Sequence, residues 1–190
     1  MSKTKKQPKQ PKERDWVEEV GAPAYATIAE MVAALQADRD RLEELRDELE
    51  ALEDEVDAIA HSADQDEDCD AKKVALIEWK EENGEELAEL VAAVTLDGDE
   101  VDEDQARERI QEDPLSLRIF GERTDGEWEA DRYELLLATS GPAVRIVGDL
   151  NGGEASSARL EVQDWYKPWT EYLAADDDVL MAYVGCFCFE

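Results

Sequence analysis

The sequence is poor in the side chains on which most enzymes and metal sites depend. It contains one histidine, His61, and three cysteines, Cys69, Cys186 and Cys188. Ser-His-Asp and Cys-His catalysis needs a placed base, and His61 falls at the end of an expected helix, so we predict no catalytic residues and no enzyme. A zinc site built from Cys and His would need all four residues, so we predict no metal. Three cysteines without a framework spacing favour a reducing cytoplasm over secretion.

Long apolar runs are also missing. The positive N-terminus is followed by polar residues instead of the apolar core of a signal peptide. No apolar run approaches the roughly 20 residues that a membrane helix needs. The Asn151-Gly152-Gly153 segment is typical of a hairpin turn, because the lysine and helix of a phosphate-binding loop do not follow it. These absences predict a cytoplasmic protein that uses neither a membrane nor a cofactor.

Positive charge is scarce and unevenly placed. The 20 Lys and Arg residues face 51 Asp and Glu residues, which gives a formal net charge of −31. Five of the nine lysines lie in residues 1–12, so residues 1–14 are predicted to be a disordered basic tail. Residues 13–190 then have a net charge of −36. Such a surface repels nucleic acid and attracts proteins with basic grooves, although adaptation to high salt would also explain the acidity.

Apolar residues repeat at alternating intervals of three and four between residues 28 and 59, and only Asp38 interrupts them. This pattern predicts a long coiled-coil helix over residues 15–62, its start marked by Gly21-Ala22-Pro23. Parallel pairing would set like charges together, so the flanking residues favour antiparallel dimerisation or packing against another helix of the same chain. We expect homo-oligomerisation through Leu35, Leu42, Leu45, Leu49 and Leu52.

The rest of the chain is predicted to be an acidic linker, residues 63–72, and an α+β domain, residues 73–190. A second helix over 71–94 is expected to place Val74, Ile77 and Leu87 on its apolar face, and a short helix follows near 103–111. The period then changes to two, which predicts an antiparallel meander of about four strands over 115–120, 132–139, 143–150 and 158–165. The last segment is predicted to be a helix after Asp176-Asp177-Asp178 that covers the sheet, with a strand over 186–189 as the alternative.

The predicted first helix has an unusual density of carboxylates. Residues 43–57 contain nine of them, which is one negative charge per roughly 2.5 Å of helix. Duplex DNA has one per about 1.7 Å and a single strand one per about 3.4 Å. The density is therefore similar to that of nucleic acid, although a solvated coiled-coil surface is the ordinary explanation for such charges. The candidate partner-binding residues are Glu43, Glu44, Asp47, Glu50, Asp54 and Asp57.

Aromatic residues cluster near the C-terminus, at Trp165, Tyr166, Trp169 and Tyr172. Trp and Tyr dominate the energetics of protein interfaces, which makes Trp165 and Trp169 candidates for contact with a partner. The competing expectation is that these side chains close the core of a small domain.

The C-terminal third resembles a family of small uncharacterised proteins of phages and other mobile elements. The resemblance is in Gly-Pro-Ala-Val-Arg-Ile at 141–146, Gln-Asp-Trp at 163–165, Pro-Trp-Thr at 168–170 and Cys-Phe-Cys-Phe at 186–189. It covers roughly residues 113–190 and implies a mobile-element origin, in which acidic proteins often act as decoys against host defence. The function expected from it is an inhibitor that imitates nucleic acid and binds a host nucleic-acid-binding protein with a basic groove, without direct contact with nucleic acid. A coiled-coil assembly or adaptor protein is the alternative.

Overall fold

The computed structural model describes residues 15–60, 68–124, 127–139 and 141–189. The chain forms two compact units. The hairpin unit is Ala33–Ala106, and the sheet unit combines residues 1–32 with residues 107–190. The expected tail over residues 1–14 and the first half of the expected acidic linker, residues 63–67, lie outside the described residues. The second half of that linker, residues 68–72, is not a linker, because it belongs to a helix that begins at Asp68.

Helix α1 (Asp15–Gln36) does not begin at Gly21-Ala22-Pro23, because it runs without interruption through Pro23. Gly21 serves close packing instead. A Cβ atom at this position would lie 2.4 Å from a ring carbon of Tyr172, so the helix can approach that ring only with glycine here. One turn further along α1, the ring of Tyr25 lies 6.2 Å from that of Tyr172.

The single long helix predicted over residues 15–62 is two helices, since α1 ends at Gln36 and α2 spans Arg39–Ala60. The interruption falls at Asp38, the one polar residue of the heptad series. Its carboxylate accepts the backbone N–H of Arg41 at 3.0 Å, and its carbonyl accepts that of Leu42 at 3.1 Å. Asp38 therefore caps α2, because a short polar side chain satisfies the free N–H groups of a first helical turn.

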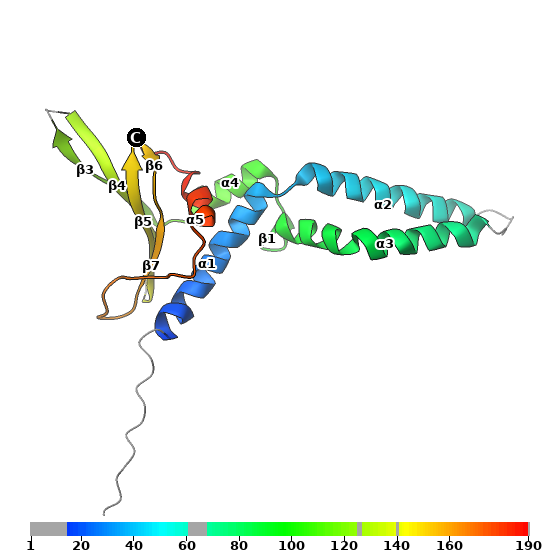
Figure 1. The fold of residues 1–190 in the computed structure, drawn as a ribbon, viewed down its shortest axis with the longest axis horizontal. Coiled ribbons are helices and arrows are strands. Elements are labelled where there is room, and N and C mark those ends of the chain that lie inside the picture. Colours follow the sequence, from blue (N-terminus) through cyan, green and yellow to red (C-terminus); the bar gives the residue numbers. More distant parts are fainter. Residues whose placement is uncertain (1–14, 61–67, 125–126, 140, 190) are drawn as a thin grey trace, which may run out of the picture. The chain divides into compact units, whose positions relative to one another are not determined.

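Helix α2 is paired with α3 (Asp68–Ala93) in an antiparallel hairpin (Figure 1). Contacts across it recur at intervals of seven residues on both helices: Arg41 with Glu86, Glu48 with Trp79, and Glu55 with Lys72. Leu42 and Leu45 are 3% and 0% exposed. The apolar side of α2 therefore packs against α3 of the same chain. For Leu42, Leu45, Leu49 and Leu52 this is packing against another helix of the same chain, the predicted alternative to dimerisation.

The predicted second helix has nearly its expected extent but a different inward face. Val74 and Ile77 are 50% and 57% exposed, so their assignment to the apolar face was wrong. Val94 is buried, and the half-buried positions before it include Trp79, which the sequence reading did not place there. The less exposed side of α3 follows intervals of three and four residues, at Leu76, Trp79, Asn83, Leu87 and Leu90, and continues to Val94 just past its end.

A short β-hairpin follows α3, made of β1 (Thr95–Leu96) and β2 (Asp99–Glu100). Asp97 and Gly98 between the strands both have positive φ, as the tightest hairpin turns require. Helix α4 (Glu103–Glu112) starts with a reciprocal cap: Asp102 Oδ1 accepts the N–H of Gln105 at 2.8 Å, and Gln105 Oε1 accepts the N–H of Asp102 at 3.0 Å.

The sheet unit confirms the α+β class and the antiparallel meander, but its sheet has six strands. The four predicted strands are β3 (Ser116–Thr124), β4 (Glu127–Ala138), β5 (Ala143–Asn151) and β7 (Arg159–Gln163). The two others, β6 (Glu154–Ala155) and β8 (Thr170–Glu171), are too short to show a period in the sequence.

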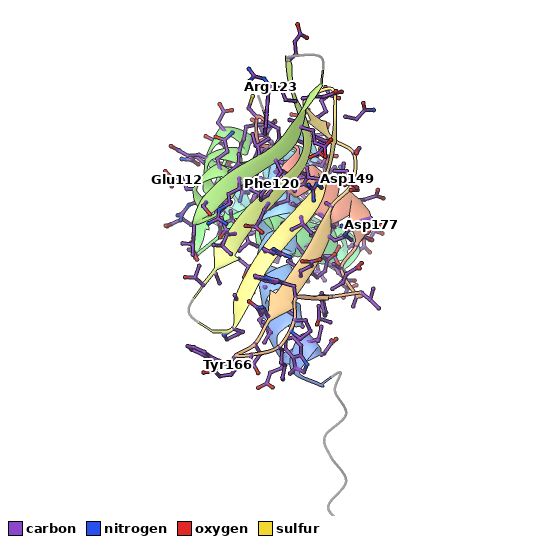
Figure 2. The ribbon with its side chains drawn as sticks, turned by 90° about the vertical axis from the view of Figure 1, so that its left-hand side faces the viewer. Glu112, Phe120, Arg123, Asp149, Tyr166 and Asp177 are labelled. Carbon is purple, nitrogen blue, oxygen red and sulfur yellow. The ribbon has the colours of Figure 1, made fainter. Side chains whose placement is uncertain are left out.

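One face of this sheet is covered and the other is open. Leu135, Ile146 and Leu160 are fully buried on the covered face, against which α1 and α5 (Asp177–Val184) lie (Figure 1). Asp176 caps α5 by accepting the N–H groups of Asp178 and Val179. The C-terminus is thus the predicted helix, and residues 186–189 form no strand. The open face is toward the viewer in Figure 2.

Candidate functional site: the acidic row of helix α2

The negative charge is concentrated in the hairpin unit. Residues 33–106 contain 28 Asp and Glu against six Lys and Arg, a net charge of −22. The rest of the chain, with 23 acidic and 14 basic residues, has a net charge of −9. About two thirds of the excess charge therefore lies in 74 of the 190 residues.

Four of the nine carboxylates of residues 43–57 have partners that reduce their effect on a ligand. Glu44 lies 3.4 Å from Arg41, and Glu53 lies 2.8 Å from Lys80. Glu55 lies 3.4 Å from Lys72, and Glu48 accepts the indole N–H of Trp79 at 3.0 Å. These four side chains join or flank the two helices and are not free for a partner.

Four others form what we call the acidic row: Glu43, Asp47, Glu50 and Asp54. They are exposed, and none makes a hydrogen bond or ion pair with another described residue. Their spacing of four, three and four residues keeps them within about 60° of one another around the helix axis, at 100° per residue. By the same geometry the row points away from α3 and extends over about 16 Å.

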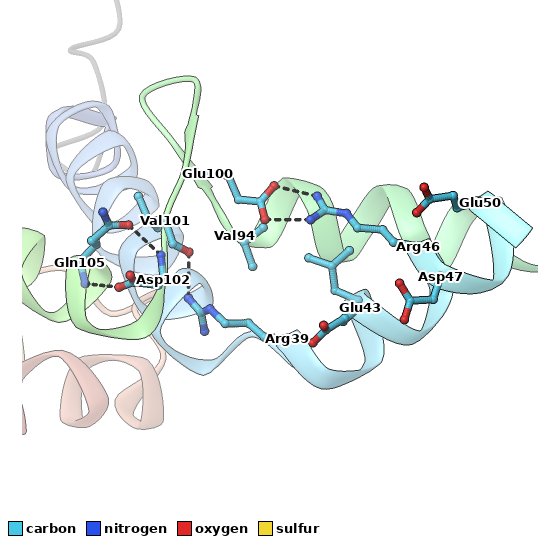
Figure 3. Close-up of a pocket in the computed structure, with 11 residues that line it drawn as sticks. Arg39, Glu43, Arg46, Asp47, Glu50, Val94, Glu100, Val101, Asp102 and Gln105 are labelled. Atoms are coloured by element: carbon cyan, nitrogen blue, oxygen red, sulfur yellow. Dashed lines mark hydrogen bonds and ion pairs between the residues drawn. The ribbon is translucent and has the colours of Figure 1, made fainter.

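A cavity of about 650 Å³ adjoins the start of the acidic row (Figure 3). Its two arginines already have partners: Arg46 binds both carboxylate oxygens of Glu100 at 2.9 and 2.7 Å, and Arg39 donates to the carbonyls of Ala34 and Val101. The hydrogen bond from Arg46 holds the pKa of Glu100 below its usual value. Three carboxylates of the row, those of Glu43, Asp47 and Glu50, also line the cavity, so the cavity suits a cationic side chain.

The structure thus separates the six acidic residues predicted to bind a partner. Four form the acidic row. Glu44 is in the ion pair with Arg41, and Asp57 is engaged in an interaction of its own. Heptad position in the sequence does not separate them, because Asp57 shares the position of Glu43 and Glu50, and only the interactions seen in the structure set Glu44 and Asp57 apart.

The residues of the aromatic cluster differ in their exposure to solvent. Tyr172 is buried, as expected of a core residue, whereas Trp165 is 69% exposed and Tyr166 is fully exposed, so the core expectation was wrong for these two. Trp169 is half-buried, with its ring 4.1 Å from the Arg145 guanidinium. Trp165 and Trp169 therefore do not share one environment.

An ion-pair network on the open sheet face was missed by the sequence reading. Arg145 in β5 contacts Glu134 in β4 and Glu161 in β7, each at 2.6 Å. Strand register places Glu161 directly opposite Arg145 and Glu134 diagonally from it, opposite Val147, and strand pairing is not visible in one sequence. The two ion pairs of Arg145 join β5 to β4 and to β7, so we infer that this network stabilises the sheet.

The described thiols are not arranged for metal binding. Cys186 is buried and Cys188 is exposed, and burial raises the pKa of Cys186. Within the described residues no group of three or more His, Cys, Asp or Glu side chains is arranged to hold a metal. His61, and the side chain of Cys69, lie outside that part of the chain.

Comparison of the chain with protein families, with curated proteins and with solved structures found no match. No helix in the described ranges has both the length and the apolar composition of a bilayer-spanning segment.

Proposed function

We propose that this protein is a non-enzymatic acidic binding protein that imitates nucleic acid and inhibits a nucleic-acid-binding defence protein of a host cell. The observation that supports the proposal is the acidic row: four exposed carboxylates in one line on α2, without partners among the described residues. Lining up like charges costs repulsion, and α2 would pair with α3 equally well without it, because the row points away from that helix.

The acidic row has a spacing related to that of a nucleic-acid strand. It presents one carboxylate per about 5.5 Å of helix, against about 3.4 Å per phosphate of a single strand. A row of this kind can occupy a line of Lys and Arg side chains in a groove that normally holds a phosphate backbone. The net charge of −22 on the same unit would speed the encounter with such a groove at low salt.

The test is capture of host proteins on the immobilised full-length chain at low and high salt. We expect basic nucleic-acid-binding proteins to be retained at low salt, released at high salt and displaced by duplex DNA. Replacing the acidic row by Gln and Asn should abolish most of this capture. Helix α2 should persist, because these positions do not pack against α3 and amides are tolerated on an exposed helix face.

The matched control removes the same number of charges from the sheet unit. Gln replaces Glu122, Glu127 and Glu129 of the β3–β4 hairpin and Glu154 of β6, all of them exposed. This variant has the same net charge as the row variant and should still capture the partner. Equal capture by the row variant and the wild type, or failure of DNA to displace the captured proteins, would contradict the proposal.

An adaptor protein is the second candidate, and the exposed side of α3 favours it. Val74 and Ile77 are one helical turn apart and expose half or more of their side chains. Apolar side chains at this spacing are typical of a surface that receives another helix. If the captured proteins depended on Val74 and Ile77 and not on the acidic row, the adaptor role would replace the mimic.

A further inference from the structure

A tight turn in the sheet unit presents two aromatic side chains to solvent. The N–H of Lys167 donates to the carbonyl of Asp164 at 2.9 Å, which places Trp165 and Tyr166 at the two central positions. We call residues 164–167 the aromatic turn. Tyr166 has φ of +64°, and Figure 2 shows it at the end of the sheet opposite to Arg123, pointing away from the strands.

Tyr166 is an unfavourable residue for this backbone. A positive φ at the second central position of a turn suits Gly or Asn, and a bulky side chain there is strained. Packing does not explain the choice, since Tyr166 is fully exposed and, among the described residues, its ring contacts only the ring of Trp165, with the two centres 6.5 Å apart. A strained, exposed aromatic residue that folding does not need points to a role in binding.

The aromatic turn is held in place from several sides. Gln163 donates its side-chain amide to the carbonyl of Lys167 at 2.9 Å. The Lys167 ammonium lies 3.2 Å from Asp164 and 4.3 Å from the centre of the Trp16 ring. Trp165 rests on Gly141, where a Cβ atom would lie 2.4 Å from the indole nitrogen. A turn fixed in this way loses little conformational entropy when it binds.

Two hollows meet at this turn. The first, of about 240 Å³, is lined by Asp164, Trp165, Tyr166 and the Gly141 turn. The second, of about 630 Å³, is mainly apolar, with Val20, Pro23 and Pro142 in its wall and the carboxylates of Glu19 and Asp164 at its edge. Both hollows share Asp164, whose pKa is held below its usual value by the N–H of Trp165 and by Lys167. It therefore stays ionised at neutral pH.

We propose that the aromatic turn binds an arginine or lysine side chain of a partner, and that the adjoining hollow receives an apolar neighbour of that residue. Two tilted π faces attract a cation. Lys167 offsets the charge of Asp164, but Glu19, which also lines the larger hollow and has no partner among the described residues, adds a negative charge beside them. The net charge of −31 repels an acidic partner or a second copy of this chain. The inference concerns the sheet unit and does not depend on the acidic row, so either proposal can fail alone.

The experiment titrates the full chain with two acetylated, amidated tetrapeptides, Ala-Arg-Leu-Ala and Ala-Gln-Leu-Ala, and follows the tryptophan indole N–H signals by NMR. The arginine peptide should shift the signal of Trp165, which is assigned with Trp165→Phe. Trp128 is 63% exposed and lines neither hollow, so its signal is the internal control and should stay in place. Equal shifts from both peptides, or equal shifts of Trp128 and Trp165, would overturn the proposal.

The decisive variant is Tyr166→Gly, with Tyr166→Asn as a second. Both residues adopt positive φ more readily than tyrosine, so the thermal midpoint should stay the same or rise. Loss of one π face should weaken binding of the arginine peptide about two- to fivefold. Undiminished binding by the folded variants would show that Tyr166 is not part of the site.

Discussion

Tyr183 shows what one buried hydroxyl contributes to the sheet unit. Its side chain is fully buried in α5, and its hydroxyl donates to a carboxylate oxygen of Asp113 at 2.5 Å. Burial, followed by the hydrogen bond to Asp113, raises the pKa of Tyr183 far above its usual value. The hydroxyl is therefore protonated at every physiological pH and always donates, which ties α5 to the end of α4.

We predict that Tyr183→Phe lowers the free energy of unfolding by about 1.5–3 kcal/mol, because it removes a hydrogen bond to a charged acceptor. Urea unfolding followed by circular dichroism measures the change. Tyr166→Phe removes a hydroxyl from a fully exposed side chain and should change stability by less than about 0.5 kcal/mol. Similar effects of the two substitutions would mean that the Tyr183 bond adds nothing.

At the scale of elements, the hairpin of α2 and α3 combines a half-buried apolar side with polar contacts one heptad apart. The hydrogen bond and charge of Arg41 lower the pKa of Glu86 below its usual value of 4.5. A carboxylate whose pKa is lower when folded stabilises the fold above the unfolded pKa and loses that effect as pH falls through the folded pKa.

We therefore predict that Glu86→Gln lowers the thermal midpoint at pH 7, and that its difference from the wild type shrinks as the pH falls below 4.5. Glu82→Gln is the matched control, since Glu82 is exposed on the same helix and has no partner among the described residues. It should not lower the midpoint at pH 7. Thermal unfolding of the three proteins at pH 7, 4.5 and 3 tests this, and a difference that did not decrease between pH 7 and pH 3 would exclude the ion pair as its cause.

At the scale of the whole molecule, the uneven charge makes the hairpin unit the part most sensitive to salt. A net charge of −22 over 74 residues repels itself, and in the described part of this unit only a few exposed ion pairs oppose that repulsion. Exposed ion pairs contribute little each, and salt screens both effects.

Raising sodium chloride from about 0.02 M to 0.5 M, which shortens the screening length severalfold, should therefore raise the thermal midpoint. Calorimetry measures the change, and the variant that lacks the charges of the acidic row should show a smaller rise. A fall of the midpoint with salt would mean that the cross-helix ion pairs outweigh the repulsion.

The sequence by itself determined the elements whose signal is local. Period-two alternation predicted the four longer strands, the Asp176 cluster predicted the cap of α5, and composition predicted the excess of acid on the segment that became α2. These features depend on residues close in the chain, so a single sequence is enough to show them.

Only the tertiary structure decided the rest, because it depends on residues far apart in the chain. The heptad series that suggested dimerisation pairs with α3 of the same chain, and this pairing separates the acidic row from the carboxylates that have partners. Asp38 was visible as an interruption, but its side chain became a helix cap only when the chain turned there. Tyr166 has no local pattern that marks it, since its strain comes from a turn fixed by Gln163, Lys167 and Gly141.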